Sequence, residues 1–343
     1  MRLVMMGTGG FAEPTFEALL ASKHEVVGLV TQPDRVVGEK RGTTRQVGKG
    51  MKEIALERDI PVYQPESINT PEGVSKLLEW KPDLLIVAAY GQILNRDVLS
   101  AAPRGGINVH ASLLPKYRGA APIAWAIYYG EKESGVTIIR MSIALDAGDM
   151  LMQESVAIGP DESAGELESR LGPLGARMAL QTIEQLEQGT TKGLQQDKSQ
   201  VTKAPKLTKE MGLIDWTRPA AAVWNQIRSM HPWPSAYCYL HRADAEPMRL
   251  IVFKAKPCGV ETSLLPCLSL SEEQTNPIRQ DKNFVATQAG PGAVIVDGKS
   301  LLVLCGQGCL ALEEVQPAGK RRMNIVDFLR GNSIPTGSRM GAA

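Results

Sequence analysis

Residues 105–149 read GGINVHASLLPKYRGAAPIAWAIYYGEKESGVTIIRMSIALDAGD, a short apolar strand followed by two loops marked by glycine. Asn108 and His110 stand two positions apart in that strand, so both side chains would project to the same face of a sheet. Asp146 follows in the second loop. Open α/β sheets place their chemistry at the carboxyl ends of such strands. An amide, an imidazole and a carboxylate that meet there could stabilise an oxyanion, move a proton and orient the base, so we predict a catalytic site.

The alternative for His110 is a purely structural role, because an isolated histidine is more often a hydrogen-bonding residue of the core than a catalyst. Its place at a strand end, on one face with Asn108 and before a loop with proline and glycine, favours catalysis. No second histidine lies nearby in the sequence, and one carboxylate would not complete a metal site. We therefore expect catalysis without a metal.

The first half of the chain alternates short apolar runs with helical patterns. The runs lie at 2–7, 25–30, 60–63, 83–89 and 106–110. This rhythm is typical of βαβ units with a parallel sheet, so we predict a doubly wound, Rossmann-like α/β domain. Two further strands, at 136–143 and 150–158, are expected as an antiparallel addition to the sheet edge. A helix should follow from about 163 to 188, and Gly189 should end it.

The turn after the first strand, Gly7-Thr8-Gly9-Gly10-Phe11-Ala12, also fits the G-x-G-x-x-A pattern of dinucleotide-binding domains. That fold would need an acidic residue at the end of the second strand. Here the strand ends in Thr31-Gln32-Pro33-Asp34, with a proline before the carboxylate. Because tight turns between strand and helix need glycine for geometry alone, NAD binding is the less favoured interpretation.

The second half of the chain has a different composition. From Thr190 to Lys206 it becomes polar, which indicates a linker. A helical pattern near 218–230 and several short apolar runs with glycine and proline then suggest a small β-barrel. We predict an N-terminal domain over 1–189, a linker over 190–206, a C-terminal domain over 207–330 and a tail over 331–343.

Charge and cysteine usage add weaker indications. Residues 201–343 hold 17 lysines and arginines against 12 acidic residues, a net charge of +5; the whole chain has 38 against 37, which leaves 21 against 25, or −4, for residues 1–200. The basic half is therefore the better candidate for a polyanion partner. The five cysteines are odd in number and form no Cys-x-x-Cys pair, so we expect reduced thiols. With no signal-peptide pattern and no long apolar window, we predict a cytoplasmic protein.

Several sequence motifs resemble those of the folate-dependent formyltransferases. INVHASLLPKYRGAAPI is followed by GVTI and LDAGDML, and RGAAPI at 118–123 is most similar to the methionyl-tRNA formyltransferases among them. The similar motifs elsewhere are VTQPDR at 30–35, VAAYGQIL at 87–94, IDWTRPA at 214–220, HPWPSA at 231–236 and VQPAGK at 315–320. The resemblance spans nearly the whole chain, and it implies an OB-like β-barrel as the C-terminal domain.

The resemblance also implies a reaction: transfer of the formyl group of 10-formyltetrahydrofolate to the free amino group of methionyl-initiator tRNA. Asn108 and a protonated His110 would donate to the tetrahedral oxyanion, and Asp146 would hold the imidazole and accept, through a water, the proton that the amine loses. Two alternatives stay open: a sibling formyltransferase with a small-molecule amine acceptor, and a non-catalytic tRNA-binding protein. The basic C-terminal half speaks against the first, and the presence of all three catalytic residues against the second.

Two sets of binding residues follow from the resemblance. The folate site would comprise Ala89, Tyr90, Gly91, Ser112, Leu113, Leu114, Pro115 and Leu145. The tRNA contacts would comprise Lys40 and Arg41 in the loop at 34–52, Lys203, Lys206 and Lys209 around the linker, and Lys320 in the C-terminal domain. The loop at 34–52 departs from the family pattern, because Glu39 stands where an arginine is expected. We expect a monomer that binds formyl-folate and initiator tRNA and no membrane.

Overall fold

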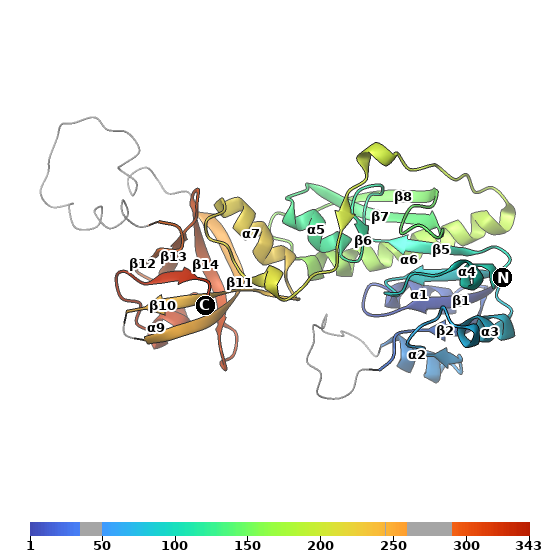
Figure 1. Ribbon diagram of the computed structural model, residues 1–343, viewed down its shortest axis with the longest axis horizontal. Coiled ribbons are helices and arrows are strands. Elements are labelled where there is room, and N and C mark those ends of the chain that lie inside the picture. The colour runs from blue at the N-terminus through green and yellow to red at the C-terminus, as the bar shows by residue number, and fades with distance from the viewer. Residues whose placement is uncertain (35–49, 244, 259–289) are drawn as a thin grey trace, which may run out of the picture. The chain divides into compact units, whose positions relative to one another are not determined.

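A computed structural model describes residues 1–34, 50–243, 245–258 and 290–343 (Figure 1). The chain divides into two compact units. The first comprises Met1–Ile127 and Glu131–Leu207, and the second comprises Tyr128–Gly130 and Thr208–Ala343. Each unit contains a large sheet of its own.

The sheet of the first unit has the strand order β3-β2-β1-β4-β5-β7-β8. Its strands are β1 (Arg2–Gly7), β2 (Glu25–Val30), β3 (Val62–Tyr63), β4 (Leu84–Ala88), β5 (Gly106–His110), β7 (Glu133–Arg140) and β8 (Met150–Ala157). The strands from β1 to β5 pair in parallel, whereas β7 and β8 add an antiparallel edge. The predicted doubly wound α/β domain is therefore confirmed. The order reverses between β1 and β4, so a crevice is expected beyond the carboxyl ends of these strands.

The helices of this unit are α1 (Glu13–Leu20), α2 (Met51–Glu57), α3 (Pro71–Trp80), α4 (Arg96–Ser100), α5 (Pro122–Tyr128) and α6 (Ala164–Gln188). The longest of them, α6, begins at a capping box in which Ser163 and Glu166 satisfy each other's backbone N–H groups. It ends at Gly189, whose φ of 69° is left-handed, as its sequence predicted. Within the described ranges, no helix is both long and apolar enough to cross a bilayer.

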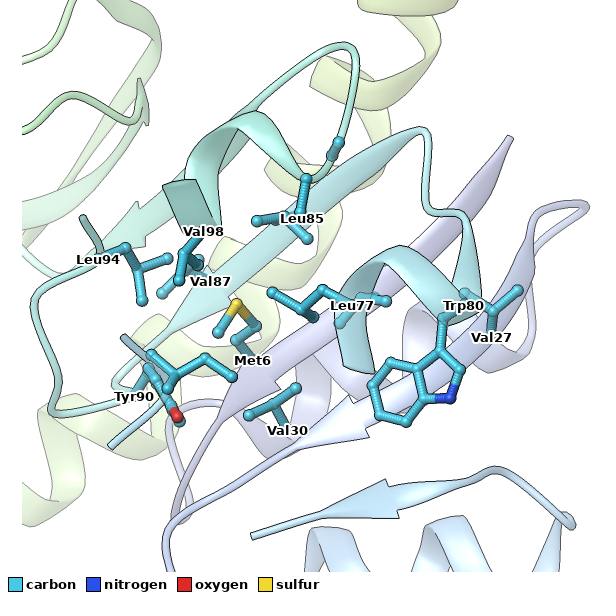
Figure 2. Close-up of a cluster of buried hydrophobic side chains, with 14 residues drawn as sticks. Met6, Val27, Val30, Leu77, Trp80, Leu85, Val87, Tyr90, Leu94 and Val98 are labelled. Atoms are coloured by element: carbon cyan, nitrogen blue, oxygen red, sulfur yellow. The ribbon is translucent and has the colours of Figure 1, made fainter. Parts of the chain in front are cut away.

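The core of the first unit has a layer on each face of the sheet. Every second residue of β1 and β4 joins a buried cluster to which α3 contributes Leu77 and Trp80 and α4 contributes Val98 (Figure 2). The intervening strand residues are also buried and point to the opposite face, where α6 contacts β5 and β7. Gly28 of β2 fits under the Trp80 ring because a Cβ there would lie 2.4 Å from it. The sheet is thus covered on both faces, which leaves its carboxyl edge for chemistry.

Leu77 and its neighbour Leu78 provide a matched test of this packing. The Leu77 side chain is fully buried, whereas Leu78 is 53% exposed. We expect Leu77→Ala to lower the free energy of unfolding by about 2–5 kcal/mol, because it removes apolar burial and leaves a cavity. Leu78→Ala should change it by less than about 0.5 kcal/mol. Urea denaturation followed by circular dichroism measures both, and equal effects would contradict the assignment of Leu77 to the core.

The segment that composition predicted to be a linker makes regular backbone hydrogen bonds with the first unit. Leu194 pairs with Met150 of β8 through two hydrogen bonds of 2.9 and 2.8 Å. After a short turn, η1 (Lys198–Gln200), strand β9 (Lys203–Ala204) pairs in parallel with β6 (Arg118–Gly119). The connecting segment is therefore part of the framework around residues 118–119 and 150.

The second unit carries an antiparallel sheet in the order β12-β13-β14-β11-β10-β16. Its elements are η2 (Glu210–Gly212), α7 (Ala220–Ser229), β10 (Ala236–Arg242), β11 (Ala245–Cys258), β12 (Val294–Asp297), β13 (Ser300–Leu304), β14 (Cys309–Pro317), β15 (Met323–Asn324), α9 (Ile325–Gly331) and β16 (Arg339–Gly341). The sheet curls back on itself, because β16 pairs with β10 and Arg339 also bridges to Ala293, just before β12. This curled, half-barrel sheet fits the predicted OB-like domain.

The expectation of reduced cysteines is wrong for one pair. Cys258 and Cys309 stand opposite each other in the antiparallel pairing of β11 with β14, and they form a disulfide with a Cα–Cα distance of 5.6 Å. A separation of 51 residues gave no local signal for this contact. Cys238 and Cys305 are free and buried, and burial raises the pKa of their thiols to about 12 and about 11. Cys267 lies outside the described residues.

Candidate active site

Three polar side chains from two distant segments meet at the carboxyl end of β5. The Asn108 amide Nδ2 lies 3.4 Å from Oδ1 of Asp146 and donates to it. The His110 Nδ1 lies 3.7 Å from the other carboxylate oxygen, Oδ2. The side chains of His110 and Asp146 are 5% and 10% exposed. The structure thus brings together the three residues that the sequence predicted to be catalytic, around a nearly buried carboxylate.

The loop between β7 and β8 places Asp146 by tight backbone packing. Asp146 has a left-handed φ of 48°, which is uncommon for a residue other than glycine and costs energy that the surrounding contacts must offset. Its Oδ2 accepts a hydrogen bond of 2.8 Å from the Gly119 backbone N–H. Gly148 must be glycine, because a Cβ there would lie 1.7 Å from the Arg140 carbonyl oxygen. The carboxylate is therefore fixed from the loop and from the chain around residue 119.

The imidazole of His110 is oriented by the loop that follows β5. Its Nε2 lies 3.0 Å from the carbonyl oxygen of Tyr117, which can only accept a hydrogen bond. The Nε2 position therefore carries the hydrogen, and Nδ1 faces the Asp146 carboxylate. Tyr117 has a left-handed φ of 62°, which turns this carbonyl back toward the ring. The Nδ1 position is 3.7 Å from Oδ2 of Asp146, which is longer than a hydrogen bond, so a protonated ring could donate from Nδ1 to an acceptor placed beside the carboxylate.

The loop predicted to hold folate is anchored by side chains that the sequence analysis did not single out. Thr137 of β7 donates its hydroxyl to the Ser112 carbonyl at 2.6 Å and accepts from the Leu114 backbone N–H at 3.1 Å. Gln153 of β8 donates to the Leu114 carbonyl at 2.9 Å. The Leu114-Pro115 peptide is cis. The antiparallel strands thus fix the shape of this loop, and no sequence motif identified the two residues that do so.

The side chain of Tyr90 points into the core, although its backbone lies at the strand end. Its ring is only 2% exposed and packs in the buried cluster of β1, β2 and β4 (Figure 2). Burial raises the pKa of its hydroxyl, which has no hydrogen-bond partner among the described residues. At the strand end this segment therefore exposes its backbone. Ala89 and Gly91 have left-handed φ values of 45° and 83°, and Gln32 Nε2 donates a hydrogen bond of 2.8 Å to the Tyr90 carbonyl. A ligand there would meet peptide groups and not the aromatic ring.

A carboxylate from α6 binds the glycine turn that follows β1. Glu168 of α6 accepts a hydrogen bond from the backbone N–H of Phe11. Burial raises the pKa of the Glu168 carboxyl, and that hydrogen bond offsets part of the rise. A dinucleotide pyrophosphate would need the same N–H groups at the start of the helix. The geometry therefore argues against the dinucleotide interpretation of this turn.

The other predicted binding residues are on the surface or outside the described residues. Leu145 is 53% exposed beside Asp146. The predicted tRNA contacts that the structure describes are all exposed, namely Lys203, Lys206, Lys209 and Lys320. Lys40 and Arg41 lie in 35–49, outside the described residues.

A buried glutamine was missed altogether. Gln196 is 5% exposed and comes from the connecting segment. Its Nε2 donates to the carbonyl oxygens of Asp146 and Gly148, each at 2.8 Å. Its Oε1 accepts from Arg118 Nε at 3.0 Å and Nη2 at 2.7 Å. A single glutamine in a polar stretch carries no pattern that would have identified it.

Comparisons with known proteins agree with this architecture. The Formyl transferase family model matches residues 1–183, and the model of the formyl transferase C-terminal domain matches residues 206–333. The methionyl-tRNA formyltransferase of Desulfotalea psychrophila is 42% identical over 335 residues, 97% of this chain and 94% of that protein. That of Alkaliphilus oremlandii is 40% identical over 342 residues, 99% and 100% of the two chains.

A solved structure shares the fold. It is the N-formyltransferase of Helicobacter canadensis in complex with folinic acid and dTDP-3-aminofucose, which matches with a TM-score of 0.61 at 16% identity. The match covers 94% of this chain and 99% of that one. Identity over nearly the full length, together with both domain models, decides the family. The chain belongs to the formyl transferase family and, within it, to the methionyl-tRNA formyltransferases.

Proposed function

We propose that this protein formylates methionyl-tRNA, with 10-formyltetrahydrofolate as the donor and the free α-amino group of methionine on initiator tRNA as the acceptor. The observation that carries the proposal is the identity of 42% over 97% of the chain to a methionyl-tRNA formyltransferase. The meeting of Asn108, His110 and Asp146 at one strand end supports it, because acyl transfer needs an oxyanion donor and a base within reach of one carbon.

The proposed reaction begins with attack of the methionine amine on the formyl carbon. The tetrahedral species carries negative charge on the former formyl oxygen, which the Asn108 amide and the protonated His110 stabilise as hydrogen-bond donors. Asp146 orients the imidazole and accepts, through a water, the proton that the amine loses. When the carbon–nitrogen bond to the folate breaks, the folate nitrogen takes up the proton that the amine lost, and the Asp146 carboxylate is restored. The products are formyl-methionyl-tRNA and tetrahydrofolate, and no covalent enzyme intermediate is needed.

For the donor site, we propose the rim formed by three segments. They are the backbone of Ala89–Gly91, the loop Ser112–Pro115 and Leu145. The left-handed backbone at Ala89 and Gly91 exposes peptide groups that can hydrogen-bond the edge of a flat ring. Exposed Leu145 offers an apolar surface beside the catalytic carboxylate. In the solved structure from Helicobacter canadensis the bound folate is folinic acid.

The test of the function is transfer of a labelled formyl group. We expect label from 10-formyltetrahydrofolate to appear on methionyl-initiator tRNA, much more slowly on methionyl-elongator tRNA, and not on free methionine. Glycinamide ribonucleotide and an amino sugar nucleotide serve as small-molecule acceptors. Efficient labelling of either, with none of the tRNA, would contradict the proposal.

We also propose that the protein is cytoplasmic and that its active species is a monomer. Light scattering should then give the mass of one 37.1 kDa chain.

For tRNA binding, we propose contacts from Lys203 and Lys206 in the connecting segment and from Lys209 just after it, all of which are exposed. Replacing all three by alanine should weaken binding of methionyl-tRNA and lower the slope of log K against log salt by about 2–3, because each lost phosphate contact removes slightly less than one. The Kd for formyl-folate should stay the same. Filter binding between low and moderate salt measures the slope.

Lys76→Ala is the control for loss of a positive charge away from the proposed tRNA contacts. Lys76 lies on α3, where it forms an ion pair with Glu79, and it belongs to none of the proposed contacts. Lys76→Ala should leave the salt slope unchanged. A triple variant with the slope of the unaltered protein would remove these lysines from the tRNA interface.

A further inference from the structure

Gln196 connects the catalytic loop to the segment that holds its carboxylate. Its amide is buried, and hydrogen bonds occupy both of its ends. The nitrogen side reaches the loop between β7 and β8, and the oxygen side reaches the guanidinium of Arg118. One side chain thus joins two segments of the candidate site, and its contacts are not part of a helix or of a strand pairing.

On the loop side, Gln196 holds the backbone of Asp146 and not its carboxylate. Its Nε2 donates to the carbonyl oxygens of Asp146 and Gly148, both at 2.8 Å. These carbonyls flank the residues that turn the loop, and Asp146 itself has the left-handed φ of 48°. Such a conformation persists only where the surroundings hold it. Loss of the two hydrogen bonds would let the peptide rotate and carry the carboxylate away from the imidazole.

On the other side, the contacts close a ring. Arg118 donates to Gln196 from Nε and Nη2, and the next residue, Gly119, donates its N–H to Asp146 Oδ2 at 2.8 Å. Arg118 and Gly119 form β6, which pairs with Lys203 and Ala204. The path therefore runs from the Asp146 carboxylate to Gly119, through Arg118 to Gln196, and back to the Asp146 backbone. A shift of any one member changes the position of the carboxylate.

We infer that Gln196 is a positioning residue for formyl transfer, which acts by fixing the place of Asp146 relative to His110 and the reacting amine. The inference rests on the proposed role of Asp146. An amide suits the position because one end must donate to two carbonyls and the other must accept from a guanidinium. Glutamate would keep the contact with Arg118 but would turn an acceptor toward both carbonyls. Alanine would remove both contacts.

The test compares Gln196→Ala and Gln196→Glu with Gln200→Ala. Gln200 is an exposed glutamine of the same segment, and its amide donates to Asp197 within its own turn at 2.9 Å. For both Gln196 variants we expect kcat to fall by about 10- to 100-fold, since a displacement on the order of 1 Å can cost about a hundredfold. The Kd values for formyl-folate and methionyl-tRNA should change less than about threefold. Gln200→Ala should match the unaltered protein.

A double-mutant cycle separates positioning from a general structural role. If Gln196 acts through Asp146, then adding Gln196→Ala to Asp146→Asn should lower kcat by less than about threefold more, because the carboxylate is already gone. A structural defect would instead multiply the two losses and weaken binding of both substrates. Multiplied losses, or a Gln196→Ala protein with normal kcat, overturn the inference. If the alanine variant fails to fold, the isosteric Gln196→Glu carries the same comparison. Absence of transfer in the unaltered protein would instead overturn the proposed function.

Discussion

Replacing His110 by alanine should lower kcat for formyl transfer by about a hundred- to a thousand-fold, the loss typical of one removed oxyanion donor. The ring is the group between the Tyr117 carbonyl and the Asp146 carboxylate, and it is 5% exposed. Alanine leaves a space that water can enter, and water is a weaker donor than a fixed imidazolium. Single-turnover transfer with both substrates saturating measures the chemical step.

His24 provides the matched control. It is also a buried histidine of the first unit, at 8% exposure, and burial lowers its pKa. Its Nδ1 lies 3.3 Å from the N-terminal amine, and the residue stands just before β2, at the amino ends of the parallel strands and away from the candidate site. His24→Ala should reduce stability while leaving kcat within about twofold, as expected for a substitution that removes packing far from the chemistry. If His110→Ala transfers formyl at a near-normal rate, the role assigned to the imidazole is wrong.

The sequence predicted the first unit well because periodic features determined it. Runs of apolar residues at a regular rhythm gave the parallel strands, and Gly189 gave the end of α6. The spacing of two between Asn108 and His110 placed both on one face of β5. In each case the signal lies within about ten residues of sequence, where the period of a strand or helix is visible.

Contacts between distant residues left no such signal. Gln196 bonds to a loop 50 residues earlier, and Cys258 pairs with a cysteine 51 residues later. The burial of Tyr90 depends on side chains from β1, β2 and α3, so a Tyr-Gly strand end gave no warning of it. No strand or helix period linked Asp146 to His110 either, and only its place in a glycine-marked loop suggested it. Fold elements could therefore be read locally, whereas the groups that position the catalytic carboxylate needed the three-dimensional structure.

The charge of Asp146 should matter more than its shape, and Asp146→Asn isolates the charge. An asparagine oxygen can still accept the Gly119 N–H, and the two hydrogen bonds from Gln196 hold the backbone whichever side chain is present. What disappears is the negative charge facing His110 Nδ1 and the base that receives the proton of the amine. We expect kcat to fall by about a thousand- to ten-thousand-fold, comparable to the loss when the carboxylate of a hydrolase triad becomes an amide.

Measurements of substrate binding and of thermal stability show whether Asp146→Asn affects the chemical step alone. The Kd for methionyl-tRNA should be unchanged. The thermal midpoint should move by only a few degrees, because the amide oxygen keeps the Gly119 N–H and only the long contact of 3.4 Å with the Asn108 amide is lost. Asp149→Asn is the control, since Asp149 is an exposed carboxylate three residues along the same loop. If Asp146→Asn lost affinity for formyl-folate and kept kcat, the carboxylate would bind the donor. Only a loss confined to kcat assigns Asp146 to proton transfer. That role would account for its burial beside an imidazole and for its left-handed backbone conformation.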